Sequence, residues 1–365
     1  MAETKHGKLE SVELDLKYRR ALGKTGLDLT VLGLGSGQLG GFQPSGESDP
    51  WLESSPEDEA LATVQSAFSS GITYFDTAPY YGYGRAEHRL GQVLRQASRE
   101  KFVLSTKIGR VLSPLRLGTP QPSDYRYGGL PFVPAFDYSY EGTMRSIEDS
   151  YQRLGLASID IAFIHDVDLF THKEPDVVER YFRESMEGAY VALDELRSAG
   201  IIRAIGCGLN DATSCSRFLR AGNFDCMMLQ GRYTLLNQCA LDEMLPICKT
   251  QGASVLIAAP FNSGILATGP VKAARYDYSD ASAEILDKVR SIESVCQRYD
   301  IALAAAALQF PLGHECVTSV VPGSKNPSEL EANINHMFTP IPDDLWAELQ
   351  QEGLLSDGAP LPKKI

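Results

Sequence analysis

The sequence lacks the features that would place this protein on nucleic acid or in a membrane. Basic residues are not in excess: 34 Lys and Arg face 47 Asp and Glu, for a net charge of -13. This balance argues against nucleic acid or an anionic membrane surface as a partner. No apolar run approaches the roughly 18 residues that a membrane-spanning helix needs. We therefore expect a soluble, cytoplasmic protein.

Paired cysteines are also missing. The seven cysteines are an odd number without a Cys-x-x-Cys pair, and they fall in apolar or helical stretches. We expect reduced core thiols, and neither a disulfide framework nor a zinc site. The first 17 residues are polar and lack the apolar segment of a signal peptide. Residues 1–17 are thus predicted to be a polar extension, and residues 18–365 a single domain.

One pattern repeats along the chain: a short apolar strand, a loop and a helix. After a predicted hairpin at 20–29, strands are expected at 29–35, 73–77, 102–107, 159–165, 202–207, 227–231, 255–259 and 317–321. Most are continuous apolar runs, as in strands buried on both faces. Alternating strands and helices require a parallel sheet. Eight units favour an α/β fold of the (β/α)8 TIM barrel type, with an open doubly wound sheet as the alternative.

Helix signals and long loops complete this pattern. Ser55 is expected to cap a helix that has Pro56 at its first position and acidic residues in its first turn. Three connections are long, at residues 41–54, 110–139 and 166–180, and all follow strands. In a barrel, such loops meet at the C-terminal face, where barrel enzymes carry their sites. Flexible insertions are the alternative interpretation of these loops.

Residues 35–40 match the G-x-G-x-x-G pattern and follow a predicted strand. In a Rossmann fold, this motif opens a helix, and an acidic residue ends a second strand about 20 residues later. Here a loop follows Gly40 and no such acidic residue is present. The sequence therefore gives no support for a Rossmann dinucleotide site.

Polar residues at successive strand ends are more informative. Asp76, Lys107 and His165 end the second, third and fourth strands, and Tyr81 follows Asp76 by five residues. On their own, Asp76 and Tyr81 are equally well a helix cap or a proton-transfer pair. A lysine ending an apolar strand needs a carboxylate partner, and a cation beside a phenol lowers its pKa from about 10. The histidine would add a donor or a second proton carrier.

Two other interpretations of the fourth strand end stay open. A lone histidine on an apolar strand is often a satisfied core residue. His165 and His172, with Asp166 and Asp168 between them, could also be a metal cluster, but their spacing is not diagnostic. No metal site is predicted.

With these strand ends in place, the chain resembles the aldo-keto reductase family from about Tyr18 to about Met337. Residues 71–82 resemble the family signature around its catalytic aspartate and tyrosine, and residues 321–333 the segment that holds the adenosine phosphate. The resemblance implies a nicotinamide-dependent oxidoreductase that binds an extended dinucleotide on a TIM barrel. It assigns Tyr81 as general acid/base, Lys107 as its pKa-lowering partner, Asp76 as the anchor of Lys107, and His165 as the orienting donor.

The resemblance also implies a cofactor site. Gly35 and Ser36 would lie beside the nicotinamide half, Asn210 and Gln230 would bind its carboxamide, and residues 260–266 would surround the pyrophosphate. The residues implied to bind the cofactor are Gly35, Ser36, Asn210, Gln230, Pro260, Ser263, Leu266, Gly323, Ser324, Lys325, Glu329 and Asn333.

Departures from the family pattern bear on this cofactor. Ala259 stands where many members carry a tyrosine stacked on the nicotinamide, and the spacing around Asn210 is shifted by about one residue. Glu329 falls where NADPH-preferring members carry an arginine for the 2′-phosphate. Because a carboxylate repels that phosphate, we predict NAD as cofactor; Lys325 retains some attraction for phosphate, so NADP remains possible.

Finer similarities point to one branch of the family. It comprises aldose 1-dehydrogenases acting on L-fucose-, L-galactose- or D-arabinose-like sugars, together with pyridoxal 4-dehydrogenases. The branch implies oxidation of an aldose at C1 to a lactone, with Trp51 and Tyr138 as candidate substrate contacts, joined by Tyr125 and Tyr127. Alternatives are a pyridoxal dehydrogenase, an NADPH-dependent aldehyde or ketone reductase, including one of secondary metabolism, and a cofactor-binding regulatory subunit. The oligomeric state is not predicted.

Overall fold

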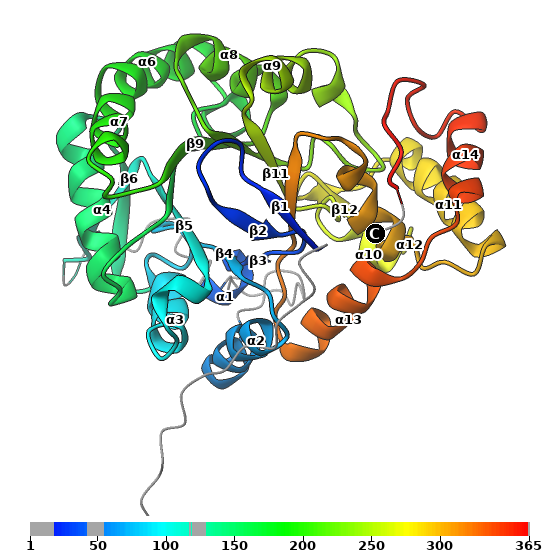
Figure 1. Ribbon diagram of the computed structural model, residues 1–365, viewed down its shortest axis with the longest axis horizontal. Helices are drawn as coiled ribbons and strands as arrows, with labels where there is room; N and C mark the ends of the chain where they lie inside the picture. The colour runs from blue at the N-terminus through cyan, green and yellow to red at the C-terminus, as the bar shows by residue number, and fades with distance from the viewer. Residues whose placement is uncertain (1–17, 42–54, 117, 119–128, 364–365) are drawn as a thin grey trace, which may run out of the picture.

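Eight parallel strands with helices between them form a barrel in the computed structural model, which describes residues 18–41, 55–116, 118 and 129–363 (Figure 1). Bridges from Leu32 to Val320 and from Gly35 to Gly323 join the first strand to the last. This confirms the predicted (β/α)8 barrel and rules out the open doubly wound sheet. The barrel strands are β3 (Leu34–Gly35), β4 (Tyr74–Asp76), β5 (Val103–Ile108), β8 (Ile161–His165), β9 (Ala204–Leu209), β10 (Cys226–Gln230), β11 (Ser254–Ala258) and β14 (Val317–Val321).

The predicted N-terminal hairpin is formed by β1 (Arg19–Ala21) and β2 (Asp28–Thr30), and it lies across the barrel in Figure 1. Its leucines Leu22, Leu27 and Leu29 join one buried cluster with side chains from the barrel strands. Arg20 fixes the hairpin by donating from Nη1 to the carbonyl of Val317, at 2.8 Å. Because Val317 begins β14, the hairpin closes the amino end of the barrel and leaves the carboxyl end for a site.

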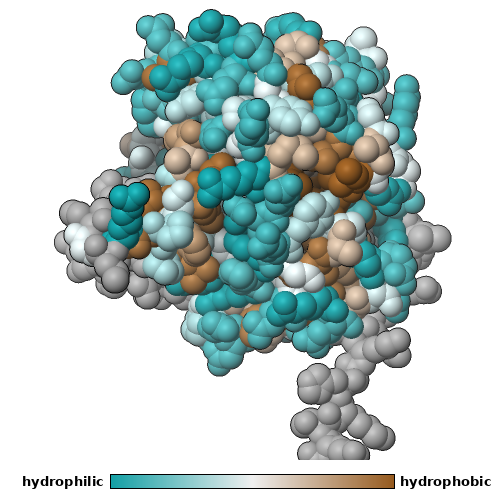
Figure 2. All heavy atoms as spheres, turned by 90° about the vertical axis from the view of Figure 1, so that its left-hand side faces the viewer, coloured by the Kyte–Doolittle hydropathy of each residue, from teal (hydrophilic) through white to brown (hydrophobic). Residues whose placement is uncertain are grey.

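Helices form the outer layer, and most of them bury one face against the strands or against a neighbouring helix. On the side covered by α4 and α7, the exposed surface is mostly hydrophilic, with apolar side chains in separate patches (Figure 2). In the described part of the chain, no helix has the length and apolar character needed to cross a membrane. The helices are α1 (Gly37–Gly40), α2 (Glu57–Ser69), α3 (Arg85–Leu94), α4 (Tyr140–Leu154), α5 (Leu169–His172), α6 (Pro175–Glu184), α7 (Tyr190–Ser198), α8 (Ala212–Ala221), α9 (Met244–Gln251), α10 (Ile265–Thr268), α11 (Ala283–Arg298), α12 (Leu303–Gln309), α13 (Pro327–Phe338) and α14 (Asp343–Gln351).

Two of the connections predicted to be long loops contain regular structure. The connection at 110–139 holds an antiparallel pair, β6 (Arg110–Pro114) and β7 (Phe132–Phe136). Neither strand was predicted, because each contains a proline, which argues against a strand. A two-stranded ribbon nevertheless tolerates proline at its open edges. The connection at 166–180 holds α5 and the start of α6. A second small ribbon, β12 (Arg275–Tyr276) and β13 (Ser279–Asp280), follows β11.

Two local predictions were wrong. Ser55 does not cap α2, because its hydroxyl donates to the carbonyl of Lys325 at 2.6 Å and so connects α2 to the loop after β14. The cysteines are all unpaired, but not all lie in the core: Cys239 is exposed and Cys316 is half-buried.

Candidate active site

Parallel register brings the polar strand ends together at the carboxyl end of the barrel. Asp76 of β4 pairs in register with Ser105 of β5, and His165 of β8 with Gly208 of β9. Lys107 is 1% exposed, and its Nζ lies 2.5 Å from Oδ2 of Asp76. The same ammonium donates to the carbonyl of Thr77 at 2.9 Å. A buried ammonium of this kind is tolerable only with such partners.

The carboxylate of Asp76 is held on its other oxygen as well. The hydroxyl of Ser105 donates to Oδ1 at 2.6 Å, and Ser105 is in turn 2.9 Å from the hydroxyl of Tyr74. Burial lowers the pKa of Lys107, but the charges of Asp76 and Tyr81 outweigh burial, so the pKa of Lys107 lies above its ordinary value. Lys107 therefore carries a fixed positive charge at the mouth of the barrel.

Tyr81 lies beside this charge. Nζ of Lys107 is 4.7 Å from the centroid of the Tyr81 ring, and the ring of His165 stands perpendicular to it at 6.0 Å. Burial raises the pKa of Tyr81, and Lys107, which acts in the opposite direction, offsets only part of this effect. Lys107 thus lowers the pKa of Tyr81, as predicted. The net pKa of Tyr81 in the protein without cofactor is nevertheless raised, which contradicts the prediction, because burial of the phenol outweighs the nearby cation.

The loop that carries Tyr81 is fixed by a close backbone contact. A Cβ at Gly40 would lie 2.5 Å from the carbonyl carbon of Tyr81, and a Cβ at Gly82 would lie 1.9 Å from the oxygen of Gly40. Side chains at either position would force the loops after β3 and β4 apart. The glycine motif at residues 35–40 therefore serves, through Gly40, to seat the tyrosine loop.

We expect Gly40→Ala to lower kcat by about tenfold to a hundredfold, since a displacement of about 1 Å at a reacting group has an effect of that size. The assay is turnover of the best substrate under saturating conditions. Gly358→Ala is the matched control, because a Cβ there meets nothing within 4 Å. Unchanged kcat in Gly40→Ala would contradict this role.

His165 is flanked by Arg110 and Asp166, neither of which was assigned to the catalytic cluster from the sequence. Nη1 of Arg110 lies 3.4 Å from Nδ1 of His165, and Nη2 of Arg110 lies 2.7 Å from Oδ2 of Asp166. Oδ1 of Asp166 is 3.4 Å from Nε2 of the same histidine. Burial lowers the pKa of His165 well below its ordinary value, and the charges of Arg110 and Lys107 lower it further. His165 is therefore neutral at physiological pH.

Asn210 follows β9 directly, and its polar groups are engaged by acidic side chains. Its Nδ2 donates to Oδ1 of Asp166 at 3.0 Å and to Oδ2 of Asp168 at 2.9 Å, and its backbone N–H donates to Asp168 at 2.8 Å. Asp168 also caps α5 through Thr171. The Nδ2 group of Asn210 is thus committed to this acidic pair, and the contact of Asn210 with the cofactor carboxamide stays a prediction.

Tyr278, from the ribbon formed by β12 and β13, also lies at the carboxyl end of the barrel. Tyr278, in the turn between β12 and β13, accepts a hydrogen bond on its hydroxyl from Nε2 of Gln230 at 3.0 Å. Its N–H donates to the hydroxyl of Ser263 at 2.9 Å, and its ring lies 6.1 Å from that of Phe170. The side chain is 56% exposed. Tyr278 thus joins two of the predicted cofactor residues, Gln230 and Ser263.

Strained backbone gathers around this mouth. Positive φ in a non-glycine residue costs roughly 1–3 kcal/mol and tends to occur at functional sites. In the loop after β11, Ala259, Asn262 and Ser263 all have positive φ. In α10, the N–H of Leu266 donates to the carbonyl of Phe261 and its side chain is fully buried, and its contact with the pyrophosphate stays a prediction. The other residues with positive φ around the mouth are Tyr83, Asp166, Asp277 and Tyr278.

The predicted adenosine end of the cofactor site lies at the start of α13. Asn326 caps this helix by accepting from the N–H of Glu329, and Oε2 of Glu329 accepts from the N–H of Lys325 at 2.8 Å. Asn333 donates to the hydroxyl of Ser324 at 3.1 Å. The carboxylate of Glu329 is therefore held at the helix N-terminus, where a favourable dipole stabilises it.

The residues present fit an extended polar ligand. Buried polar atoms without a hydrogen-bond partner among the described residues include Oγ of Ser36, Oε1 of Gln38 and Oδ1 of Asn262. Ser36 and Gln38 follow β3, Gln38 within α1, and Asn262 follows β11; β14 lies between those strands in the closed barrel. Gly323 leaves room beside Gln38, since a Cβ there would lie 2.8 Å from Oε1. A dinucleotide, with hydrogen-bonding groups along its length, matches this row.

The two predicted substrate contacts have different outcomes. Trp51, like Tyr125 and Tyr127, lies outside the described residues. Tyr138 has no exposed surface, and its hydroxyl donates to the carbonyl of His165 at 2.6 Å. Its position corrects the expectation of a substrate contact: the side chain supports the His165 backbone from inside the protein.

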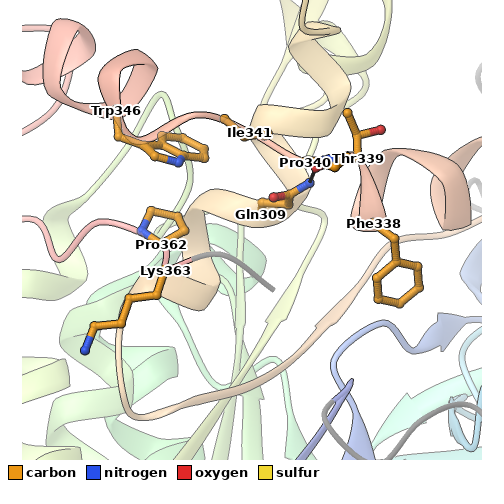
Figure 3. Close-up of a pocket in the computed structure, with 8 residues that line it drawn as sticks. All are labelled: Gln309, Phe338, Thr339, Pro340, Ile341, Trp346, Pro362 and Lys363. Atoms are coloured by element: carbon orange, nitrogen blue, oxygen red, sulfur yellow. Dashed lines mark hydrogen bonds between the residues drawn. The ribbon is translucent and has the colours of Figure 1, made fainter.

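No group of three or more His, Cys, Asp or Glu within the described ranges could hold a metal ion. A separate cavity of about 110 Å³ lies among the C-terminal segments, where Gln309 donates to the carbonyl of Thr339 at 2.7 Å (Figure 3). Its lining contains none of the predicted catalytic or cofactor residues. It is lined by Gln309, Phe338, Thr339, Pro340, Ile341, Trp346, Pro362 and Lys363.

Sequence analysis missed Ser105, Arg110, Asp166 and Tyr278 as parts of this site. Only Ser105 carried a usable signal, because it lies two residues before Lys107 on one strand and so faces the same side. Asp166 was considered solely as part of a metal cluster. Arg110 and Tyr278 reach the mouth from ribbons that the sequence pattern did not indicate.

The sequence of this chain is similar to that of known oxidoreductases along most of its length. The sequence profile described as "Aldo/keto reductase family" matches residues 31–352. A pyridoxal 4-dehydrogenase from Microbacterium luteolum is 41% identical over 355 residues, which cover 94% of this chain and 100% of that protein. A D-threo-aldose 1-dehydrogenase from a Pseudomonas species is 35% identical over 347 residues, covering 92% and 97%.

Among solved structures, the holo form of an aldo-keto reductase from Bacillus halodurans superposes with a TM-score of 0.67. The match covers 93% of this chain and 97% of that one, at 22% identity. At this identity the likeness speaks for the fold alone, and it agrees with the closed barrel described above.

Proposed function

Because this chain belongs to the aldo/keto reductase family, and so is an oxidoreductase acting on CH–OH or C=O groups, we propose that it oxidises a cyclic hemiacetal to a lactone with NAD. The observation that carries the proposal is the cluster at the barrel mouth, where Lys107 lies between the carboxylate of Asp76 and the ring of Tyr81, with His165 across from it. This cluster offers one group that exchanges a proton, one fixed cation and one neutral donor.

The substrate class follows from chemistry that the two curated relatives' substrates share. An aldose closes on an internal hydroxyl to a cyclic hemiacetal, and pyridoxal does the same through its neighbouring hydroxymethyl group. In both, the carbon to be oxidised bears a hydrogen and a hydroxyl, and loss of both gives a lactone. Aldoses are our first candidate substrates. Pyridoxal is the second, favoured by the 41% identity to a pyridoxal 4-dehydrogenase.

In the proposed step, the hemiacetal hydroxyl gives its proton to the phenolate oxygen of Tyr81. Lys107 stabilises that phenolate, and Asp76 holds Lys107 in place. His165 donates a hydrogen bond from Nε2 to the substrate oxygen and so fixes its orientation. A bound NAD would supply the acceptor for the hydride that leaves the carbon. The carbon–oxygen single bond becomes the lactone carbonyl, so that one hydride and one proton leave the substrate.

The cofactor would be held by the row of polar residues along β3, β14 and β11. Ser36 and Ser263 supply hydroxyls, and Gln230 supplies an amide once it releases Tyr278. Glu329 supports NAD over NADP, because a carboxylate fixed at the start of α13 repels a 2′-phosphate. The proposal also includes a single domain and a cytoplasmic location; seven unpaired cysteines support a reducing compartment.

The experiment is a turnover screen of purified protein with aldoses, pyridoxal and simple aldehydes, using NAD, NADP and their reduced forms. We expect a lactone product and a kcat/KM at least about tenfold higher with NAD, the effect of roughly 1.4 kcal/mol of phosphate repulsion. A higher kcat/KM with NADP would overturn the cofactor assignment. Efficient reduction of simple aldehydes without hemiacetal oxidation would overturn the substrate class.

A further inference from the structure

Arg110 begins β6, three residues after Lys107, and its side chain is only 7% exposed. The guanidinium carbon lies 4.2 Å from the centroid of the Tyr80 ring and 4.4 Å from that of Phe136. A buried charge between two aromatic rings needs a counter-ion, and Asp166 provides it at 2.7 Å. The position of this ion pair is therefore fixed by contacts of Arg110 with two aromatic rings.

The two members of the ion pair face different nitrogens of the His165 imidazole: Arg110 lies near Nδ1, and Asp166 lies near Nε2. A guanidinium is always protonated and can only donate. Nδ1 of His165, 3.4 Å from Nη1 of Arg110, must then be the accepting nitrogen. In a neutral imidazole, the remaining proton is on Nε2. Oδ1 of Asp166 lies 3.4 Å from Nε2, so its negative charge favours a proton on that nitrogen and leaves the N–H available to the substrate oxygen.

Further contacts fix the acidic half of this arrangement. Asp166 has a φ of 59°, a conformation that persists only when its surroundings impose it. Asn210 imposes it in part, by donating to Oδ1 of Asp166 at 3.0 Å. On the other side, Tyr138 donates to the backbone carbonyl of His165. The imidazole thus has a defined position and a defined pattern of donors and acceptors.

We propose that Arg110 and Asp166 are positioning residues that hold His165 as the neutral tautomer with its proton on Nε2. His165 then only donates a hydrogen bond to the substrate oxygen, and Tyr81 is the sole proton carrier. The inference rests on the proposed function for its catalytic meaning, but the tautomer itself is a property of the protein alone.

The charged and titratable groups that contact His165 or shift its pKa act consistently. Lys107 from β5 and Arg110 from β6 oppose a positive charge on His165. Asp76 is neutralised by Lys107, and Asp166 by Arg110. Tyr81, whose ring faces His165, has a raised pKa and so remains a neutral phenol near pH 7. His165 therefore has no uncompensated anion to draw a second proton.

The direct test is nitrogen NMR of histidine-labelled protein without cofactor, with the His165 signals identified by their loss in His165→Asn. We expect a protonated Nε2 and an unprotonated Nδ1 that do not titrate between pH 5.5 and 8.5, a window of roughly one pH unit below and two above the ordinary histidine pKa of about 6.5. In Arg110→Met, we expect mixed tautomers and a titration inside that window. An Nδ1–H tautomer in the wild type, or an unchanged signal in Arg110→Met, would overturn the proposal.

Two further variants keep the test decisive. Asp166→Asn preserves volume and removes the negative charge beside Nε2, so the tautomer should again become mixed even if Arg110→Met does not fold. Arg99→Met is the matched control, because Arg99 forms a comparable ion pair elsewhere in the protein. Its Nη2 lies 2.5 Å from Oδ2 of Asp160. Arg99→Met should leave the His165 signals unchanged. If it altered them as Arg110→Met does, the effect would be general destabilisation and the proposal would fail.

Kinetics then connect the tautomer to the reaction. Arg110→Met should lower kcat by about tenfold to a hundredfold, as expected of a displaced orienting group, while the Kd for NAD changes less than about threefold. A loss of NAD binding with unchanged kcat would assign Arg110 to the cofactor and overturn its positioning role. If the NMR result holds but no hemiacetal is oxidised, the proposed function fails and the tautomer assignment stands.

Discussion

Replacing Tyr81 with phenylalanine is expected to lower kcat by roughly a hundredfold to ten-thousandfold, the contribution of a general acid/base. The ring and its contact with Lys107 remain, and only the group that exchanges the proton is lost. Because the pKa of Tyr81 is raised by burial, its base form grows as pH increases. Oxidation by the wild type should therefore accelerate from pH 7 to pH 9.5, and Tyr81→Phe should lose this dependence. Steady-state kcat across that range is the measurement.

The control and the contrary outcomes separate three functions. Tyr83→Phe, two residues away in the same loop, should keep wild-type turnover. Calorimetric titration with NAD should give an unchanged Kd for Tyr81→Phe, since the cofactor residues are intact. Turnover that survives in Tyr81→Phe would refute the phenol as proton carrier. If the wild type binds NAD but turns over no substrate, the chain acts as a cofactor-binding regulatory subunit instead.

Lys107→Met is expected to cost both stability and activity. Removing one partner of a buried ion pair leaves an uncompensated charge and costs about 3–5 kcal/mol. Here that charge is Asp76, which is 3% exposed and, among the described residues, retains only Ser105 as a hydrogen-bonding side chain. Turnover should fall by at least about a hundredfold, because the phenolate of Tyr81 loses its cation. Urea unfolding and kcat report the two effects separately.

A second substitution separates the two roles of the pair. In the Lys107→Met background, Asp76→Asn removes the orphaned charge, so a large part of the lost stability should return. Turnover should stay at its low level, because no cation faces Tyr81. If the double variant regained turnover, Lys107 would be a structural residue only. If Lys107→Met were as stable as the wild type, the carboxylate would have found another partner.

The barrel itself was within reach of sequence analysis. Strand and helix periodicities are local properties, so the eight apolar runs were located within a few residues of β3, β4, β5, β8, β9, β10, β11 and β14. The ends of these strands were therefore also predicted to within a few residues. Asp76, Lys107 and His165 end or nearly end β4, β5 and β8, so a closed parallel sheet had to bring them to one mouth.

Local signals failed where prolines or short turns interrupt a strand pattern. β6 and β7 each contain a proline, and β12 and β13 have two residues each. Arg110 and Tyr278 reach the mouth from these ribbons, which is why neither was predicted. The corrections at Ser55 and Tyr138 have a similar origin: each side chain found a partner far along the chain, Lys325 and His165 respectively.

By itself, the sequence determined the alternating fold, the three polar residues at the strand ends and the choice of Tyr81 by its spacing from Asp76. Tertiary structure decided the rest. It brought Arg110 into contact with His165, 55 positions away in the sequence. It also packed the loop that carries Tyr81 directly against Gly40. It also reversed the expected pKa of Tyr81, because burial and nearby charge act in opposite directions and their balance depends on how completely the folded chain encloses the phenol.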